Sequence, residues 1–107
     1  MTDKQYYLYI LASKRNGTLY RGITSDLIKR IWQHKEGLVD GFSKRYKTKT
    51  LVYLESHKDD EEAILREKRI KKWNRQWKIN LIEKENPNWD DLYPNLLQMT
   101  GTPRSFG

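Results

Sequence analysis

The pattern of apolar and polar residues near the start of the chain predicts two paired strands. Residues 5–12 (QYYLYILA) are rich in aromatic and β-branched side chains, which is typical of a strand. The dipeptide Asn16-Gly17 follows, and it favours a two-residue hairpin turn because both central residues of a type I′ turn need positive φ. Residues 18–24 (TLYRGIT) then predict the returning strand.

A two-residue loop at Asn16 and Gly17 would fix which residues of the two strands face one another. We expect the opposed pairs 13/20, 11/22 and 9/24. Because side chains alternate between the faces of a sheet with period two, these positions share one face. Tyr9 and Tyr20 are therefore predicted to project from the same face of the sheet.

Beyond the second strand, apolar residues recur about every 3.6 positions and no longer at every second position, which predicts a helix. Either Ser25 or Asp26 supplies the N-cap, and Gly37 ends the helix. The apolar face is formed by Leu27, Ile28, Ile31 and Trp32. Arg30 and His34 are four residues apart and lie at the edge of that face, on the border between core and solvent.

The middle of the chain predicts a loop, a third strand and a second helix. Residues 37–49 are polar and basic, contain two glycines and are predicted to form a loop. Residues 50–56 (TLVYLES) predict a strand, and residues 59–77 predict one long helix. Asp59 and Glu62 have the spacing of a capping box, so the helix is expected to begin there.

The apolar side of this second helix contains one carboxylate. Its apolar arc is formed by Ala63, Ile64, Ile70, Trp73 and Trp77. The opposite side carries Lys68, Arg69, Lys72 and Arg75. Glu67 falls inside the apolar arc, and an ionised carboxylate is costly to bury unless it is paired, hydrogen-bonded or bound to a metal. Glu67 is therefore either the partner of an arginine or a residue of a functional site.

The last part of the chain changes in character. Residues 86–95 (NPNWDDLYPN) contain two prolines and two aromatic residues, and they predict a short helix or a packed extension. The predicted order is β-β-α-β-α followed by this C-terminal extension. We expect a single domain over residues 1–97 and a flexible tail over residues 98–107.

The charge of the chain indicates a class of binding partner. The 107 residues contain 21 Lys and Arg against 14 Asp and Glu, a formal net charge of +7. Such an excess favours polyanionic partners, nucleic acid first, although a solubilising surface would have the same composition. There is no cysteine, which excludes disulfides and thiolate metal sites. No apolar run is long enough to span a membrane, so we expect a cytoplasmic protein without a membrane partner.

The candidate chemistry is phosphodiester hydrolysis, which needs a base for water, a metal ion and a cation for the developing charge. Tyr20 could be the base, but a free tyrosine has a pKa of about 10 and would need a nearby cation. Arg30 could clamp the scissile phosphate, and Glu67 could be the sole protein ligand of Mg²⁺ or Mn²⁺. The structural alternatives are a strand tyrosine that fills space, a solvated Arg30–His34 pair and a salt bridge for Glu67.

The segments YLYIL, LYRG, DLIKRIWQH and EAILREKRIKKW, in this order and spacing, resemble the GIY-YIG nuclease superfamily. The closest likeness is to its small stand-alone YhbQ-like members, related to the N-terminal nuclease domain of the repair protein UvrC. The resemblance implies an α+β fold, a small three-stranded antiparallel sheet flanked by helices. It also implies catalytic roles for Tyr9, Tyr20, Arg30 and His34 and a metal-binding role for Glu67.

The chain departs from the family pattern at two places. Tyr7 stands where the first motif has glycine, and Arg21 replaces the apolar middle residue of Tyr-Ile-Gly. By strand alternation Arg21 points away from Tyr20, and we interpret it as facing solvent or DNA. The family asparagine has two candidates, Asn74 and Asn80.

The leading hypothesis is a divalent-metal-dependent endonuclease that acts on duplex, branched or single-stranded DNA, in DNA repair or recombination. Basic side chains are expected to hold phosphates without reading sequence: Lys44, Arg45, Lys47, Lys68, Arg69, Lys72 and Arg75. A protein partner would then supply targeting, and the chain is expected to act as a monomer or homodimer. The alternatives are a nucleic-acid-binding module of the same fold with little or no cleavage, and a protein-interaction domain.

Overall fold

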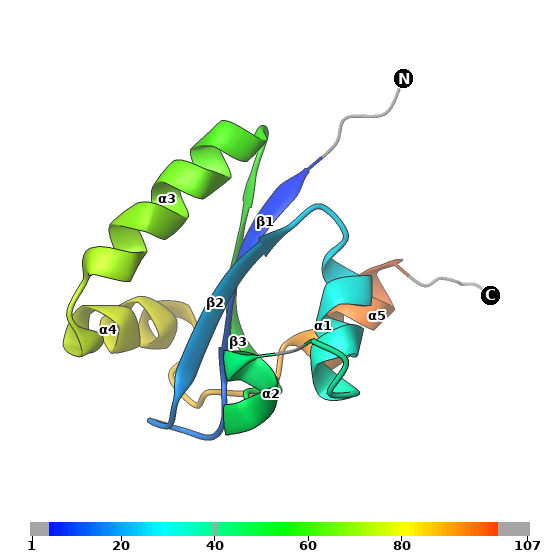
Figure 1. Ribbon diagram of the computed structural model, residues 1–107, viewed down its shortest axis with the longest axis horizontal. Helices are drawn as coiled ribbons and strands as arrows, with labels where there is room; N and C mark the ends of the chain where they lie inside the picture. The colour runs from blue at the N-terminus through cyan, green and yellow to red at the C-terminus, as the bar shows by residue number, and fades with distance from the viewer. Residues whose placement is uncertain (1–4, 40, 101–107) are drawn as a thin grey trace.

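The computed structural model describes residues 5–39 and 41–100, which form one sheet with helices on both faces (Figure 1). In chain order the elements are β1 (Tyr6–Ala12), β2 (Leu19–Thr24), α1 (Leu27–Lys35), α2 (Phe42–Tyr46), β3 (Thr50–His57), α3 (Asp60–Lys72), α4 (Arg75–Glu85) and α5 (Tyr93–Thr100). The three strands are antiparallel in the order β2-β1-β3. The predicted α+β class and the three-stranded antiparallel sheet are confirmed.

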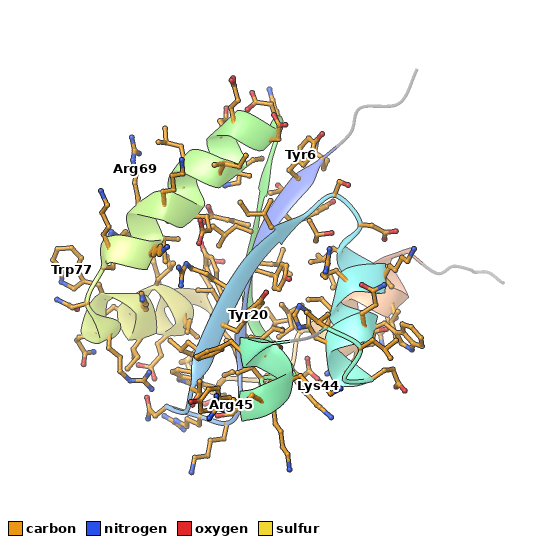
Figure 2. The ribbon with its side chains drawn as sticks, viewed as in Figure 1. Tyr6, Tyr20, Lys44, Arg45, Arg69 and Trp77 are labelled. Carbon is orange, nitrogen blue, oxygen red and sulfur yellow. The ribbon has the colours of Figure 1, made fainter. Side chains whose placement is uncertain are left out.

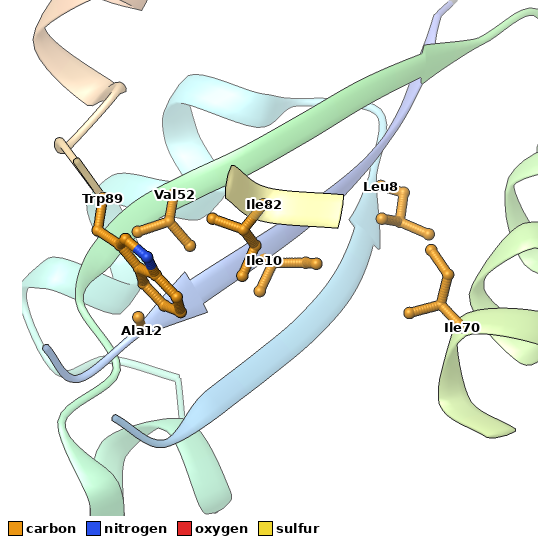
Figure 3. Close-up of a cluster of buried hydrophobic side chains, with 7 residues drawn as sticks. All are labelled: Leu8, Ile10, Ala12, Val52, Ile70, Ile82 and Trp89. Carbon is orange, nitrogen blue, oxygen red and sulfur yellow. The ribbon is translucent and has the colours of Figure 1, made fainter. Parts of the chain in front are cut away.

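The central strand β1 is buried on both faces, which explains its nearly continuous apolar sequence. Its even positions face α3 and α4 in one core cluster (Figure 3), formed by Leu8, Ile10, Ala12, Val52, Ile70, Ile82 and Trp89. Its odd positions face α1 in a second cluster, formed by Tyr9, Leu11, Leu27, Ile31 and Leu51. In Figure 1, α1, α2 and α5 lie on one side of the sheet while α3 and α4 lie on the other. The strand β2 is left as an edge between the two layers.

The hairpin loop between β1 and β2 is longer than predicted. Leu11 faces Tyr20 and Tyr9 faces Gly22, so the expected pairs were wrong by two residues. The Ser13 N–H donates to the Thr18 carbonyl at 3.0 Å, and the Thr18 N–H donates to the Ser13 Oγ at 2.9 Å, which closes a larger loop. Because the observed register differs from the expected one by an even number of residues, Tyr9 and Tyr20 still share one face.

Residues 37–49, predicted to be a loop, contain the short helix α2. The residue that follows it, Lys47, takes a left-handed conformation with φ 56°, which turns the chain back toward β3. The Thr48 N–H donates to the Ser43 carbonyl, and the Ser43 hydroxyl bonds Thr48 Oγ1 at 2.8 Å. Side-chain hydrogen bonds therefore close this segment, and apolar periodicity does not reveal them.

The single long helix predicted over residues 59–77 was also wrong, because the chain breaks between α3 and α4. Trp73 is extended with ψ 148°, and the Asn74 side chain accepts from the Trp77 N–H at 2.9 Å, so Asn74 is the N-cap of a new helix. The start was predicted correctly, since Asp59 caps α3 through the Glu62 N–H at 2.8 Å. Past the break the apolar arc does not continue, and the Trp77 side chain is 56% exposed.

The C-terminal extension packs back onto the sheet. Buried Asn86 donates from Nδ2 to the Val52 carbonyl and accepts from the Asp90 N–H, both at 3.0 Å, which fixes the turn after α4. The Leu92 N–H donates to the Leu51 carbonyl at 2.8 Å, and α5 then packs against α1. The predicted tail boundary at residue 98 falls inside α5, and residues 101–107 lie outside the described residues. In the described part of the chain, no helix has the length and apolar character needed to cross a membrane.

Candidate active site

A buried chain of hydrogen bonds joins β1, α1 and α2 beneath one end of the sheet. Tyr9 and His34 are each only 2% exposed, and the Tyr9 hydroxyl lies 2.9 Å from His34 Nε2. The other ring nitrogen, Nδ1, lies 2.8 Å from the Ser43 hydroxyl, which in turn bonds Thr48 Oγ1. Each polar atom of the histidine ring thus has a partner, and the ring is fixed in place.

Burial keeps both rings of this network uncharged. It raises the pKa of Tyr9 well above its usual value of 10, with Tyr20 adding to the rise and the Arg30 charge opposing it. Burial and, to a smaller extent, the positive charge of Arg30 lower the pKa of His34 to about 4. At neutral pH the pair is therefore a neutral hydroxyl and a neutral imidazole. Such a pair positions its neighbours and carries no charge of its own.

The close approach of Tyr9 explains the glycine of the second motif. An added Cβ at Gly22 would lie 2.4 Å from the Tyr9 hydroxyl oxygen and 2.6 Å from its Cζ. Gly22 faces Tyr9 directly across the β1–β2 pair. The aromatic ring thus crosses the neighbouring strand at a position where any side chain would collide with it.

Tyr20 and Arg30 lie next to this network with their polar groups free. The Tyr20 ring centroid is 5.1 Å from that of His34 and 6.4 Å from that of Tyr9. Arg30 acts electrostatically on both Tyr9 and His34, which brings it to the same place from α1. Among the described residues, neither the Tyr20 hydroxyl nor the Arg30 guanidinium has a hydrogen-bond or ion-pair partner. Figure 2 shows Tyr20 at the centre of the face between the two helical layers.

Glu67 lies on the α3 side of the sheet, and its partner is Arg21. The Arg21 Nε donates to Glu67 Oε2 at 2.6 Å, with side-chain exposures of 26% and 24%. Arg21 faces Ile10 across the strand pair, so it points to the α3 side as strand alternation predicts. The interpretation of Arg21 as a solvent- or DNA-facing side chain is corrected, because it makes the ion pair that the structural alternative for Glu67 required.

The donor chemistry at Glu67 fits a single divalent cation. The described residues contain no group of three or more His, Cys, Asp or Glu side chains that could hold a metal together. Glu67 is half-buried, and among the described residues its Oε1 has no hydrogen-bond partner. Magnesium often keeps several waters and takes one or two carboxylates, so one accessible carboxylate oxygen suits it. The structure brings Tyr9, Tyr20, Arg30 and His34 together, and Glu67 lies across the edge of β2 from them.

The predicted basic residues fall into separate groups. Lys44, Arg45 and Lys47 are exposed on and after α2, beside Tyr20, whereas Arg69 lies on the outer side of α3 (Figure 2). Lys68 and Lys72 are also exposed. Arg75 donates from Nη2 to the carbonyls of Asn16 and Gly17, both at 2.6 Å, so it holds the hairpin loop.

Sequence reasoning missed three residues near the candidate site. Lys78 and Phe42 line a pocket at the edge of β2, and the buried Ser43 hydroxyl forms a hydrogen bond with His34. Lys78 could have been found from its position in the first turn of the helix that Asn74 caps. The prediction of one continuous helix over residues 59–77 left no reason to look for that turn. Of the two asparagine candidates, Asn74 caps α4, and Asn80 is exposed and accepts from Gln76 Nε2 at 2.9 Å.

A hairpin that contributes two tyrosines, followed by a helix that contributes an arginine and a histidine, defines the class of this domain. The family model described as the GIY-YIG catalytic domain matches residues 5–80. The chain therefore belongs to the GIY-YIG catalytic domain family, a family of nuclease domains. Both motif segments, residues 7–9 and 20–22, lie within the matched range.

Among its relatives are UPF0213 proteins, which it matches over most of their length. It is 38% identical to the UPF0213 protein SSP2268 of Staphylococcus saprophyticus over 78 residues, 73% of this chain and 94% of that one. It is 33% identical to a UPF0213 protein of Pediococcus pentosaceus over 87 residues, 81% of this chain and 90% of the other. The solution NMR structure of the UPF0213 protein BH0048 from Bacillus halodurans aligns with a TM-score of 0.49 at 26% identity, covering 92% of this chain and 99% of that chain.

Proposed function

We propose that this protein is a divalent-metal-dependent endonuclease that hydrolyses phosphodiester bonds of DNA. The observation that carries the proposal is the pair of polar groups left free beside a fully bonded network. The Tyr20 hydroxyl and the Arg30 guanidinium have no partner among the described residues, while every polar atom of the neighbouring His34 ring has one. Free groups of this kind are available to a substrate. A role in DNA repair or recombination rests on the family resemblance alone.

The reaction assigns one task to each free group. The planar fork of Arg30 binds the scissile phosphate and stabilises the negative charge that grows on its oxygens. Tyr20, as a phenolate, accepts a proton from water while the water oxygen bonds to phosphorus. The bond from phosphorus to the leaving oxygen breaks, and that oxygen takes a proton from solvent. The neutral Tyr9–His34 pair keeps the Tyr20 ring in position.

Glu67 is the residue that would hold the cation. When bound, a divalent ion supplies positive charge for the phosphoryl and leaving oxygens. The Oε1 atom of Glu67 is the oxygen left without a partner among the described residues, and Oε2 is the one bonded to Arg21. The Arg21 ion pair competes with a cation for this carboxylate. That competition favours the second candidate function, a nucleic-acid-binding module with little or no cleavage.

A cleavage assay with matched variants tests the proposal. Supercoiled, branched and single-stranded DNA are incubated with Mg²⁺ or Mn²⁺, and binding is measured alongside. We expect Tyr20→Phe, Arg30→Lys and Glu67→Gln each to reduce cleavage by about a hundredfold or more. The controls Tyr6→Phe and Glu61→Gln change two of the same residue types elsewhere and should retain activity. If no DNA is cleaved with either metal and Glu67→Gln leaves binding unchanged, the binding-module function replaces the nuclease.

A further inference from the structure

A pocket runs along the exposed edge of β2, next to the residue proposed as the base. It has a volume of about 280 Å³ and is lined by Thr18, Leu19, Phe42, Arg75 and Lys78. One wall comes from α4 and the other from α2, so the pocket joins the two helical layers across the edge strand. Pockets for drug-sized ligands start at about 300 Å³, so this one has room for about one nucleotide and not for a duplex.

The α4 wall of this pocket carries positive charge that no carboxylate cancels. The side-chain ammonium of Lys78 has no hydrogen-bond or ion-pair partner among the described residues. Partial burial lowers the pKa of Lys78, and the charges of Arg21 and then Arg75 lower it further. Arg75 donates only to neutral backbone carbonyls, so its charge remains. Clustered cations without a counter-charge attract an anion.

The α2 wall carries exposed aromatic rings that continue from the site. Phe42 is 48% exposed and stacks against Tyr20 with ring centroids 6.3 Å apart and planes 25° apart. Tyr46, which is 45% exposed, lies with its ring centroid 4.6 Å from that of Phe42. Neighbouring Lys44 and Arg45 on the same helix are exposed cations. Aromatic rings set among basic side chains are the arrangement with which proteins bind unpaired nucleotides, because every base has a face that can stack.

We propose that this pocket is a subsite for one unpaired nucleotide of the DNA substrate, with its base against Phe42 and its phosphate on Lys78. In the interior of a duplex both faces of a base are covered by its neighbours, so an internal base that stacks on Phe42 must be unpaired. Because Phe42 also contacts Tyr20, the unpaired nucleotide lies beside the scissile bond. The preferred substrate therefore carries an overhang, flap or gap. This inference rests on the proposed nuclease function and specifies its substrate class.

Binding without metal tests the subsite separately from catalysis. A duplex with a short single-stranded overhang and the matching blunt duplex are titrated in EDTA, with 2-aminopurine at the first unpaired position. We expect tighter binding of the overhang and quenching of its fluorescence. Phe42→Ala should weaken overhang binding about tenfold, abolish quenching and leave blunt-duplex binding unchanged. Phe42→Trp should retain both, which separates stacking from a folding defect, and Trp77→Ala is the control for loss of an exposed aromatic.

The phosphate contact has its own measurement. Lys78→Gln should weaken overhang binding and reduce the slope of log affinity against log salt by about one, whereas Lys84→Gln on another side of α4 should weaken it less. Equal binding of blunt and overhang DNA, or an equal loss on both with Phe42→Ala, would overturn the subsite even if DNA is cleaved. Failure of the nuclease proposal would instead appear as absent cleavage with the overhang preference and quenching intact.

Discussion

Replacing Gly22 with alanine inserts a methyl group into the space occupied by Tyr9. The new carbon would lie 2.4 Å from the hydroxyl oxygen, 2.6 Å from Cζ and 3.0 Å from Cε2 of that ring. Optimal carbon contacts are about 3.5–4.0 Å, so the ring would have to move by roughly 1 Å. The ring is buried, and its hydroxyl bonds His34, which is itself held by Ser43. It therefore cannot move without breaking that hydrogen bond.

The expected cost follows from these contacts. Overpacking of a filled core costs about 1–3 kcal/mol, and losing a buried hydrogen bond adds about 1 kcal/mol. The gain from replacing glycine in a strand, about 0.5–1 kcal/mol, offsets part of this. We expect Gly22→Ala to lower the free energy of unfolding by about 2–3 kcal/mol, which corresponds to a fall of roughly 10–20 °C in Tm for a domain of this size.

Denaturant unfolding of a double-mutant cycle measures the effect. Tyr9→Leu removes the atoms that the new methyl group meets, so Gly22→Ala made on that background should cost less than about 0.5 kcal/mol. The control is Gly37→Ala, where φ is +72° and no atom lies within 4 Å of the added Cβ. That change should cost about 1–2 kcal/mol from backbone strain, equally on both backgrounds. If Gly22→Ala costs the same with and without the Tyr9 ring, the collision is not the reason for the glycine.

Three further changes test other parts of the structure. Asn86→Ala should lower the free energy of unfolding, measured in urea, by about 2–3 kcal/mol because it leaves buried backbone groups unpaired. The control Asn88→Ala, at an exposed position, should change it by less than about 0.5 kcal/mol, and equal effects of the two changes would contradict a structural role for Asn86. Since burial lowers the pKa of His34 to about 4, the unfolded state takes up the proton first as the pH falls from 6.5 to 4. Stability should therefore fall over that window by about 3 kcal/mol more than in His34→Gln, and parallel stability–pH curves would refute this. Arg21→Thr should raise Mn²⁺ affinity at Glu67 about fivefold in an electron paramagnetic resonance titration, and an unchanged affinity would show that the ion pair does not compete.

The sequence determined the elements whose signals are local. Strand-forming composition in residues 5–12 and 50–56 predicted β1 and β3, and the Asp59 cap marked the start of α3, because strand preference and capping act within a few residues. Tyr9 and Tyr20 were correctly predicted to share one face, since a register error of two residues preserves alternation. The four side chains that the sequence proposed for this face, Tyr9, Tyr20, Arg30 and His34, lie together in the structure.

Tertiary structure decided what depends on residues far apart in the chain. The hairpin loop is held by Arg75, which reaches it from α4, 59 residues beyond Asn16, and no pattern within the loop encodes that contact. The partner of Glu67 is Arg21, 46 residues earlier, and the pair forms only because α3 packs on the β2 side that Arg21 faces. Local periodicity fixes which way a side chain points, but packing of the layers fixes what it meets. For this protein, the sequence by itself supplied the side chains of the proposed site, and only the fold decided that one of them, Glu67, forms an ion pair with an arginine.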